Sequence, residues 1–313
     1  MHGNDLAAVQ AALGLGELGY VDLAVQRDLA QITARWPFLA EGRLPPAGNQ
    51  ASARPAPGKA PRSLALRGLR GGCGTTALTA ALGHALQRLG QRVLMIDMNP
   101  DNQLRHHCNL PAASETGWAR AAFDRSAWTD CAWRVLPALY LLPYGRLAAT
   151  EQAQLEQFLQ RTPAFWTQRL GALARLFDWV ILDLPQRLPG HAHLEGCTLQ
   201  LCLLDADPAC HLRLQEPQAL PADSWLLVNR YDPTRALQRD LLLLWQKTLA
   251  ARLVPQCVHD DEAVREALAH QLPLGVHAPH SAAAEDVLSL ATWCLARGNQ
   301  RRAAPAEAVE AAR

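Results

Sequence analysis

Short apolar runs alternate along most of the chain with longer stretches in which apolar side chains recur at helical spacing. The apolar runs predict β-strands at residues 92–97, 138–143, 179–183, 198–205 and 224–229. The amphipathic stretches predict helices, notably over residues 164–177, 234–252 and 281–297. Continuous apolar strands separated by helices indicate an α/β fold. Its sheet is mostly parallel, helices cover both faces, and ligands bind at the carboxyl ends of the strands.

The clearest functional signal lies in residues 63–89. A short apolar run ends in a glycine-rich turn, and two threonines then open a helix rich in alanine and leucine. Glycines let the backbone come close to a ligand, and the first amide groups of a helix bind phosphate oxygens. We therefore expect a nucleotide at this turn. The alternative is an ordinary strand-to-helix turn that binds nothing.

This turn departs from the usual phosphate-binding loop. A Walker A loop reads G-x-x-x-x-G-K-[ST], but Leu69 stands at the first glycine position and Thr75 at the lysine position. What remains is a nest of backbone amides and the hydroxyl of Thr76, which stands where a Mg²⁺ ligand is expected. The glycines of this nest are Gly71, Gly72 and Gly74.

Three predicted strands end in polar residues that suit a nucleotide site. Asp97 and Asp183 each close a strand, and with Thr76 they are spaced in sequence like the Mg²⁺ shell of a P-loop nucleotidase. A single aspartate after a strand is more often a helix cap, so only the two aspartates together with the glycine-rich turn indicate a metal site. Asn229 closes another strand, where its amide would contact an adenine or form a turn.

Residues 1–41 are predicted to form a small helical unit, and the proline-rich residues 42–62 form a linker to the main domain. One face of the main helix in this unit carries four apolar side chains, Val25, Leu29, Ile32 and Trp36. So short a unit has too little core of its own to bury that face. It is therefore an interaction module for a partner, or an arm that packs on its own main domain.

Composition limits the range of functions. The 313 residues carry a formal net charge of +1, so no basic excess indicates DNA binding. The eight cysteines form no C-x-x-C pair and no cluster at zinc spacing, which favours buried thiols in a reducing cytosol over electron transfer or metal insertion. With no secretion signal and no apolar run of membrane-spanning length, we expect a soluble cytoplasmic protein.

Residues 63–298 resemble the MinD/ParA class of deviant Walker ATPases. The loop K-G-G-x-G-K-T-T of that class is matched by Arg70-Gly71-Gly72-Cys73-Gly74-Thr75-Thr76. The segments DMNPDN, ILDLP, LLVNRYD and LGVHAPHSAAAEDVLSLA follow the same class. Within it, the loop without lysine and the segments MNPDNQLR, ACHLRL and HDDEAVREAL resemble the BcsQ family of cellulose biosynthesis proteins. Residues 19–41 resemble its small companion family BcsR, so the chain looks like a BcsR–BcsQ fusion.

The resemblance implies a P-loop NTPase fold that binds ATP with Mg²⁺ and dimerises face to face with nucleotide between the protomers. Residues 70–76 and Asn229 would bind the nucleotide. Thr76, Asp97 and Asp183 would hold Mg²⁺, partly through water. In this class the first lysine of the loop reaches the phosphates of the partner. Arg70 stands at that position, and the alternative is an arginine exposed at a turn.

The resemblance also implies a regulatory or assembly role in the bacterial cellulose synthase complex, with subunits of the synthase as partners and no nucleic acid. Residues 299–313 are expected to form a disordered tail without the apolar face of a membrane-binding helix. Recruitment to the inner membrane would then be peripheral, through protein partners. The helical unit at residues 1–41 is a candidate for that contact.

Two departures from the ATPase class predict slow or absent hydrolysis. Thr75 removes the cation that bridges the β- and γ-phosphates, and Asn99 replaces the acidic residue that positions the attacking water in that class. Asp97 and Asp101 are the remaining candidates for a catalytic role, although Asp101 lies two residues further on. The alternative function is an active ATPase that positions cellular cargo, the secretion machinery or DNA.

Overall fold

The computed structural model describes residues 62–111, 113–173, 176–192, 197–216 and 223–310 of the chain. The helical unit predicted at residues 1–41, with its apolar face of Val25, Leu29, Ile32 and Trp36, lies outside these residues. Residues 42–61 of the predicted linker also lie outside them, whereas its last residue, Arg62, begins the first strand.

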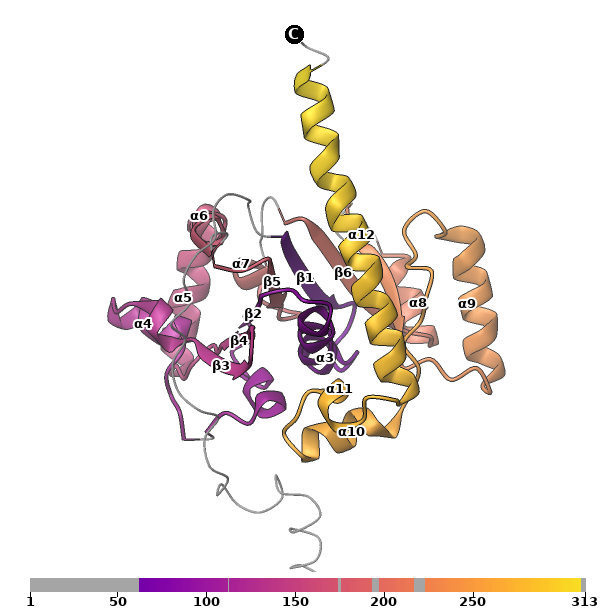
Figure 1. Cartoon of the computed structure of the whole chain (residues 1–313), viewed down its shortest axis with the longest axis horizontal. Coiled ribbons are helices and arrows are strands. Elements are labelled where there is room, and N and C mark those ends of the chain that lie inside the picture. The colour runs from indigo at the N-terminus through magenta and orange to yellow at the C-terminus, as the bar shows by residue number, and fades with distance from the viewer. Residues whose placement is uncertain (1–61, 112, 174–175, 193–196, 217–222, 311–313) are drawn as a thin grey trace, which may run out of the picture.

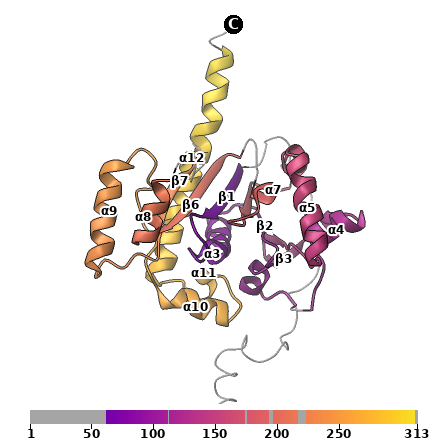
Figure 2. The same ribbon diagram turned by 180° about the vertical axis from the view of Figure 1, so that it is seen from behind.

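Seven strands form one sheet in the order β3-β4-β2-β5-β1-β6-β7 (Figures 1 and 2). They are β1 Arg62–Gly68, β2 Val93–Asp97, β3 Trp133–Leu136, β4 Leu139–Leu142, β5 Trp179–Asp183, β6 Leu199–Asp205 and β7 Trp225–Asn229. All neighbouring strands run parallel except β3, which is antiparallel to β4. The mostly parallel α/β sheet expected from the apolar runs is confirmed.

Helices cover both faces of this sheet (Figure 2). The longer ones are α3 Thr75–Arg88, α4 Trp118–Asp124, α5 Ala149–Arg161, α6 Ala164–Leu173, α8 Pro208–Leu214, α9 Ala236–Thr248, α10 Glu262–Ala269 and α12 Ala282–Glu310. The short ones are η2 Leu104–Cys108, η3 Trp128–Cys131, α7 Pro189–Ala192 and α11 Leu274–His277.

The two covered faces explain why the strands are apolar at consecutive positions. In β2, Val93 and Met95 belong to a hydrophobic cluster shared with α3 and α12. Leu94 and Ile96, which alternate with them, belong to a second cluster shared with α4, α5 and α6. Because successive side chains of a strand point to opposite faces, each face needs its own apolar set.

Trp118 lies at the centre of the second cluster and connects it to the carboxyl end of β2. Its ring packs edge-on against Tyr144 and Trp166, with ring centroids 5.1 and 4.9 Å away. Its indole N–H donates a hydrogen bond of 2.7 Å to the backbone oxygen of Asp97. This buried contact fixes the backbone at a residue that the sequence analysis placed in the metal site.

The hairpin of β3 and β4 was only half predicted, because the sequence pattern indicated β4 alone. The strand β3 is half-buried at the edge of the sheet, so it lacks the continuous apolar run of the inner strands. A two-residue turn joins it to β4, and Ala138 in this turn has a positive φ of 62°. An alanine in that conformation gives no turn signal in a sequence.

The last helix, α12, continues to Glu310 and projects away from the body of the domain (Figure 1). Residues 299–310 are therefore helical, where the sequence pattern led us to expect a disordered tail. Among the described residues, none of the helices has an apolar stretch long enough to cross a membrane.

Gly117, just before α4, provides a test of the packing around Trp118. A Cβ at this position would lie 2.2 Å from the backbone nitrogen of Gly145 and 2.3 Å from the backbone carbon of Tyr144. Backbone atoms cannot turn away as side chains do, so Gly117→Ala should lower the free energy of unfolding by about 1–3 kcal/mol. Urea unfolding followed by circular dichroism measures this change.

Gly171→Ala in α6 is the matched control, because a Cβ at Gly171 would have no neighbouring atom within 4 Å. Removing a helical glycine there should raise the free energy of unfolding by about 0.5–1 kcal/mol. Equal effects of the two alanines would contradict the packing described for Gly117.

Candidate functional site

Residues 69–74 connect β1 to α3 and form the glycine loop. Gly72 and Gly74 have positive φ angles of 83° and 84°, and Gly74 is the N-cap of α3. A Cβ at Gly71 or Gly72 would meet no atom within 4 Å, so the outer side of the loop is open. The first amide groups of α3 have no partner inside the helix, and they lie next to this open side.

Asp97 and Asp183 lie side by side at the carboxyl ends of β2 and β5, as partners in the strand register. Both are almost fully buried. The two oxygens of Asp97 accept hydrogen bonds of 3.0 Å from the backbone amides of Asn99 and Leu104. The Oδ2 atom of Asp183 is buried with no hydrogen-bond partner among the described residues, although its carboxyl group interacts with the hydroxyl of Thr76.

Burial dominates the electrostatics of this carboxylate pair. It raises the pKa of Asp183 to about 7, against the opposing effect of the hydrogen bond with Thr76. Burial also raises the pKa of Asp97 well above its usual value, and the neighbouring charge of Asp183 raises it further. A divalent cation would relieve both effects, since carboxylate and hydroxyl oxygens are the ligands that Mg²⁺ prefers. The predicted ligands Thr76, Asp97 and Asp183 therefore fit such an ion.

Arg70, at the start of the loop, is held by carboxylates of its own chain. Its Nη2 atom lies 2.6 Å from Oδ2 of Asp205 and 2.5 Å from Oδ2 of Asp207. Arg230 also forms an ion pair with Asp205, and its Nε donates to Oδ1 at 2.9 Å. The side chain of Arg70 is 35% exposed, so part of it remains accessible while Nη2 is held by the two carboxylates.

Asn229, at the end of β7, contacts the loop directly. Its Nδ2 donates a hydrogen bond of 2.8 Å to the backbone oxygen of Cys73. A Cβ at Gly74 would lie only 2.7 Å from the same Nδ2, so this close approach requires glycine. The side-chain amide of Asn229, which the sequence analysis considered as a contact to adenine, thus also holds the loop in place.

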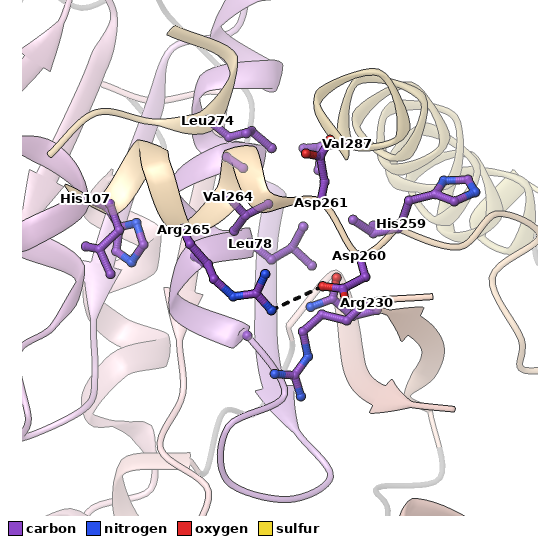
Figure 3. Close-up of a pocket in the computed structure, with 16 residues that line it drawn as sticks. Leu78, His107, Arg230, His259, Asp260, Asp261, Val264, Arg265, Leu274 and Val287 are labelled. Carbon is purple, nitrogen blue, oxygen red and sulfur yellow. Dashed lines mark hydrogen bonds and ion pairs between the residues drawn. The ribbon is translucent and has the colours of Figure 1, made fainter. Parts of the chain in front are cut away.

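A pocket of about 200 Å³ opens beside Gly74 and Asn229 (Figure 3). Apolar side chains from α3, α10, α11 and the segment before α10 line it, among them Leu78, Val258, Val264 and Leu274. Polar side chains also line it, including Arg230, Asp260 and Arg265. The last two form an ion pair of 3.4 Å, which Figure 3 marks. An apolar pocket with a few polar groups suits a planar base.

The sequence analysis did not assign residues 258–265 to the site, although it noted the segment HDDEAVREAL as a family resemblance. The same holds for Arg230, which directly follows Asn229. Position after a strand was a usable signal for Arg230. The pocket wall from α10 had no such signal, because only the fold brings that helix to the loop.

Of the two positions that depart from the ATPase class, Asn99 lies in a turn and Thr75 begins a helix. The backbone amide of Asn99 donates to Asp97, and its Oδ1 accepts from the amide of Asp101 at 3.2 Å. Asp101 itself is exposed. Thr75 is the first residue of α3, and its backbone oxygen accepts a hydrogen bond from the hydroxyl of Thr79. The loop itself therefore carries one cation, Arg70, and no lysine.

A family model described as "Cellulose biosynthesis protein BcsQ" matches residues 62–295, which include the loop, both aspartates and the pocket. The chain belongs to the BcsQ family. It is 39% identical over 236 residues to the cellulose biosynthesis protein BcsQ of Escherichia coli, with 74% of this chain and 93% of that protein covered. It is 40% identical over 246 residues to BcsQ of Salmonella typhimurium, with the same coverage of both proteins.

The fold of this BcsQ relative is that of MinD/ParA-like P-loop NTPases. It superposes on the ATP complex of McdA from Cyanothece with a TM-score of 0.60 and 17% identity, covering 76% of this chain and 98% of that one. For the cell division ATPase MinD of Pyrococcus furiosus the TM-score is 0.57 at 20% identity, covering 74% and 97%. The MinD/ParA-like fold expected from the sequence is confirmed.

The buried Asp183 predicts how stability depends on pH when no metal is bound. Its carboxyl group keeps a proton up to about pH 7 when folded but only to about pH 4 when unfolded. The protonated Asp183 therefore contributes fully to the free energy of unfolding below about pH 4. As the pH rises from 4 towards 7, the free energy of unfolding falls by roughly 1 kcal/mol per pH unit. Asp183→Asn should make this fall smaller and leave the part that the buried Asp97 contributes, and urea unfolding in EDTA across the pH range measures the difference.

Asp223→Asn is the matched control, since Asp223 is exposed and precedes the amino end of β7, whereas Asp97 and Asp183 lie at the carboxyl ends of their strands. That variant should keep the pH profile of the unchanged protein. Parallel profiles for Asp183→Asn and the unchanged protein would contradict the buried, protonated state of Asp183.

Proposed function

We propose that this BcsQ-family protein binds Mg-ATP and that binding, rather than hydrolysis, controls its dimerisation. The observation that carries the proposal is the buried Oδ2 of Asp183, which has no hydrogen-bond partner among the described residues and lies next to Asp97. A buried carboxylate oxygen without a partner is unfavourable, and a cation at this point would satisfy it.

Under this proposal the chain holds each part of Mg-ATP with a different group. The amides of residues 70–76 would bind the phosphates at the positive end of α3. Thr76, Asp97 and Asp183 would hold Mg²⁺, partly through water. The base would enter the pocket next to Asn229, whose side-chain oxygen remains available for an amino group of adenine.

Hydrolysis would be very slow or absent. Phosphoryl transfer depends on groups that position water and stabilise charge in the transition state. Thr75 supplies no charge at the lysine position, and Asn99 uses its side-chain oxygen for a turn. A steady turnover of about one per minute or faster that Asp97→Ala abolishes would favour the alternative, an active ATPase that positions cargo.

The role of the switch would be to assemble or regulate a cellulose synthase complex. The relatives named above, which are cellulose biosynthesis proteins, support this role. We place the protein in the cytoplasm, recruited to the inner membrane by subunits of the synthase or by regulatory proteins. The BcsR-like residues 1–41 would provide a contact with a partner or with their own domain. No nucleic acid partner is proposed, since the formal net charge is +1.

Loss of the metal ligand tests the binding site itself. Asp183→Asn should weaken Mg-ATP binding by about 10- to 100-fold, because the amide cannot supply the negative charge that the cation needs. It should leave ATP binding in EDTA nearly unchanged. Isothermal titration of the full chain, with and without Mg²⁺, measures both. Asp223→Asn serves as the control, and an equal loss in both variants would argue against a cation at Asp183.

The variant Arg70→Ala tests dimerisation separately from nucleotide binding. If Arg70 reaches the phosphates of the partner, Arg70→Ala should bind Mg-ATP as a monomer but fail to dimerise with it. Light scattering with ATP, ADP and no nucleotide measures the assembly state. Arg213→Ala, which removes an exposed arginine of α8, is the matched control and should dimerise normally. A dimer of Arg70→Ala that forms as readily as the control would refute the contact across the interface.

A further inference from the structure

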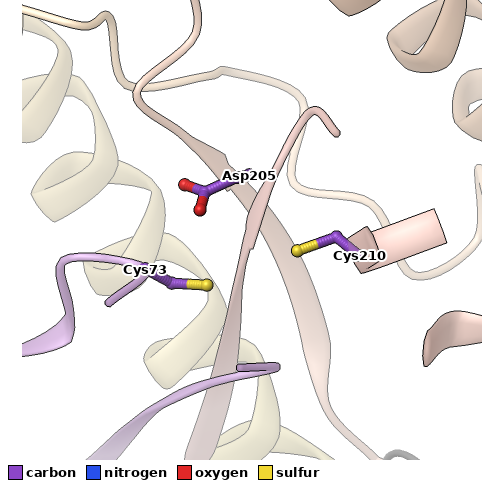
Figure 4. A group of neighbouring side chains, drawn as sticks. All are labelled: Cys73, Asp205 and Cys210. Atoms are coloured by element: carbon purple, nitrogen blue, oxygen red, sulfur yellow. The ribbon is translucent and has the colours of Figure 1, made fainter. Parts of the chain in front are cut away.

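Cys73 of the glycine loop and Cys210 of α8 meet beside Asp205 (Figure 4). The two Sγ atoms and a carboxylate oxygen of Asp205 all lie within 4.8 Å of one another, and all three residues are buried. No spacing in the sequence links the two cysteines, since one follows β1 and the other follows β6. The fold alone brings them together, because β1 and β6 are neighbours in the sheet.

Ion pairs hold both ends of this thiol pair in place. Arg70, three residues before Cys73, binds Asp205 and Asp207. Asp207 caps α8, and its Oδ1 accepts a hydrogen bond of 2.7 Å from the backbone amide of Cys210. The loop and the start of α8 are therefore joined by charged groups that act next to the sulfur atoms.

The two thiols differ in acidity. A hydrogen bond from Cys210 lowers the pKa of Cys73, with further help from the backbone amide and the positive charge of Arg70, while burial opposes the shift. The same hydrogen bond, together with burial, raises the pKa of Cys210. A pair made of one more acidic thiol and one protonated neighbour is suited to thiol oxidation, because the thiolate is the nucleophile.

A metal ion is the competing occupant of this cluster, since two sulfurs and a carboxylate can bind a soft cation. However, both oxygens of Asp205 already accept hydrogen bonds from arginines, namely Arg70 and Arg230. Two guanidinium groups at the same point oppose a further positive charge. The surroundings thus favour reaction between the sulfurs over binding of a cation.

We propose that Cys73 and Cys210 form a reversible disulfide with a peroxide as oxidant, which ties the glycine loop to the start of α8. The Cys73 thiolate attacks one oxygen of hydrogen peroxide, giving a sulfenic acid and releasing hydroxide. The sulfur of Cys210 then attacks the Cys73 sulfur, the S–O bond breaks, and the hydroxyl leaves with the thiol proton as water. Each sulfur loses one electron, and the peroxide gains both.

The loop gives the reaction both access and freedom to move. A Cβ at Gly71 or Gly72 would lie in open space, whereas Cys73 is only 1% exposed, so a peroxide reaches its sulfur when the loop shifts. The sulfurs must come closer, to about 2 Å, for the bond to form. Glycines on both sides of Cys73, each with a positive φ, allow the backbone to make this adjustment.

Treatment of the reduced full chain with hydrogen peroxide tests the proposal. Two of the eight thiols should disappear first, and peptide mapping should find Cys73 linked to Cys210. A more acidic thiol carries more thiolate at neutral pH, so this pair should react before the other six thiols. Dithiothreitol should restore both thiols.

Three variants make the test decisive. Cys73→Ser should abolish the fast reaction, and Cys210→Ser should leave Cys73 as a sulfenic acid that dimedone traps. Cys131→Ser is the matched control, because Cys131 is more exposed and should not matter. First oxidation at Cys131 or Cys257 would overturn the proposal. So would stoichiometric binding of Zn²⁺ that protects Cys73 and Cys210 and is lost in both serine variants.

One consequence rests on the proposed function. A disulfide would add a covalent link to the ion pairs that keep Arg70 beside Asp205, so the oxidised protein should no longer dimerise with Mg-ATP. Light scattering before and after dithiothreitol measures this effect. Because the cross-link is mapped without nucleotide, its formation can succeed or fail independently of dimerisation. A mapped cross-link with normal dimers would refute the loop-locking consequence alone.

Discussion

Two acidic side chains buried at neighbouring strand ends are the constraint on which the site depends. Parallel strands end at the same edge of a sheet, so Asp97 and Asp183 meet there whether or not a ligand is present. Backbone amides satisfy Asp97, whereas one oxygen of Asp183 has no hydrogen-bond partner among the described residues. The fold therefore carries an unfavourable electrostatic contribution that a cation would remove. Binding that removes it stabilises the folded state, which couples the ligand to folding.

Because the loop has no lysine, Arg70 is the one cationic side chain in it. Its ion pairs with Asp205 and Asp207 are partly exposed, so each contributes only modestly to stability. Phosphate oxygens offer a guanidinium the same charge and the same bidentate geometry as these carboxylates. Exchange of one set of partners for the other therefore involves little net loss of interaction energy. In the proposed dimer, a nucleotide on the second protomer would compete for Arg70, because the carboxylates hold this arginine without burying it completely.

The sequence predicted those parts of the fold and site that depend on local pattern. The inner strands were predicted within about two residues, because burial on both faces makes them apolar throughout. The glycine loop and the two aspartates followed from residue types placed directly after strands. The edge strand β3 was missed, since a half-buried strand lacks that pattern. The pocket wall formed by Val264 and Leu274, and the meeting of Cys73 with Cys210, arise from contacts between distant segments that no local spacing encodes.

The position of the loop in the sheet explains how it can be ordered without a lysine. Strand β1 lies between β5, which carries Asp183, and β6, which carries Asp205. On the β6 side the chain itself holds the loop, through Asn229 on the oxygen of Cys73 and through Arg70 on Asp205. The opposite side faces the buried carboxylates. The amides of the loop are thus preorganised by contacts that involve no ligand, and preorganised donors bind an anion with less loss of conformational freedom. If the loop binds phosphate as proposed, the contacts of Asn229 and Arg70 would take over part of the role that a lysine side chain has in an ordinary phosphate-binding loop.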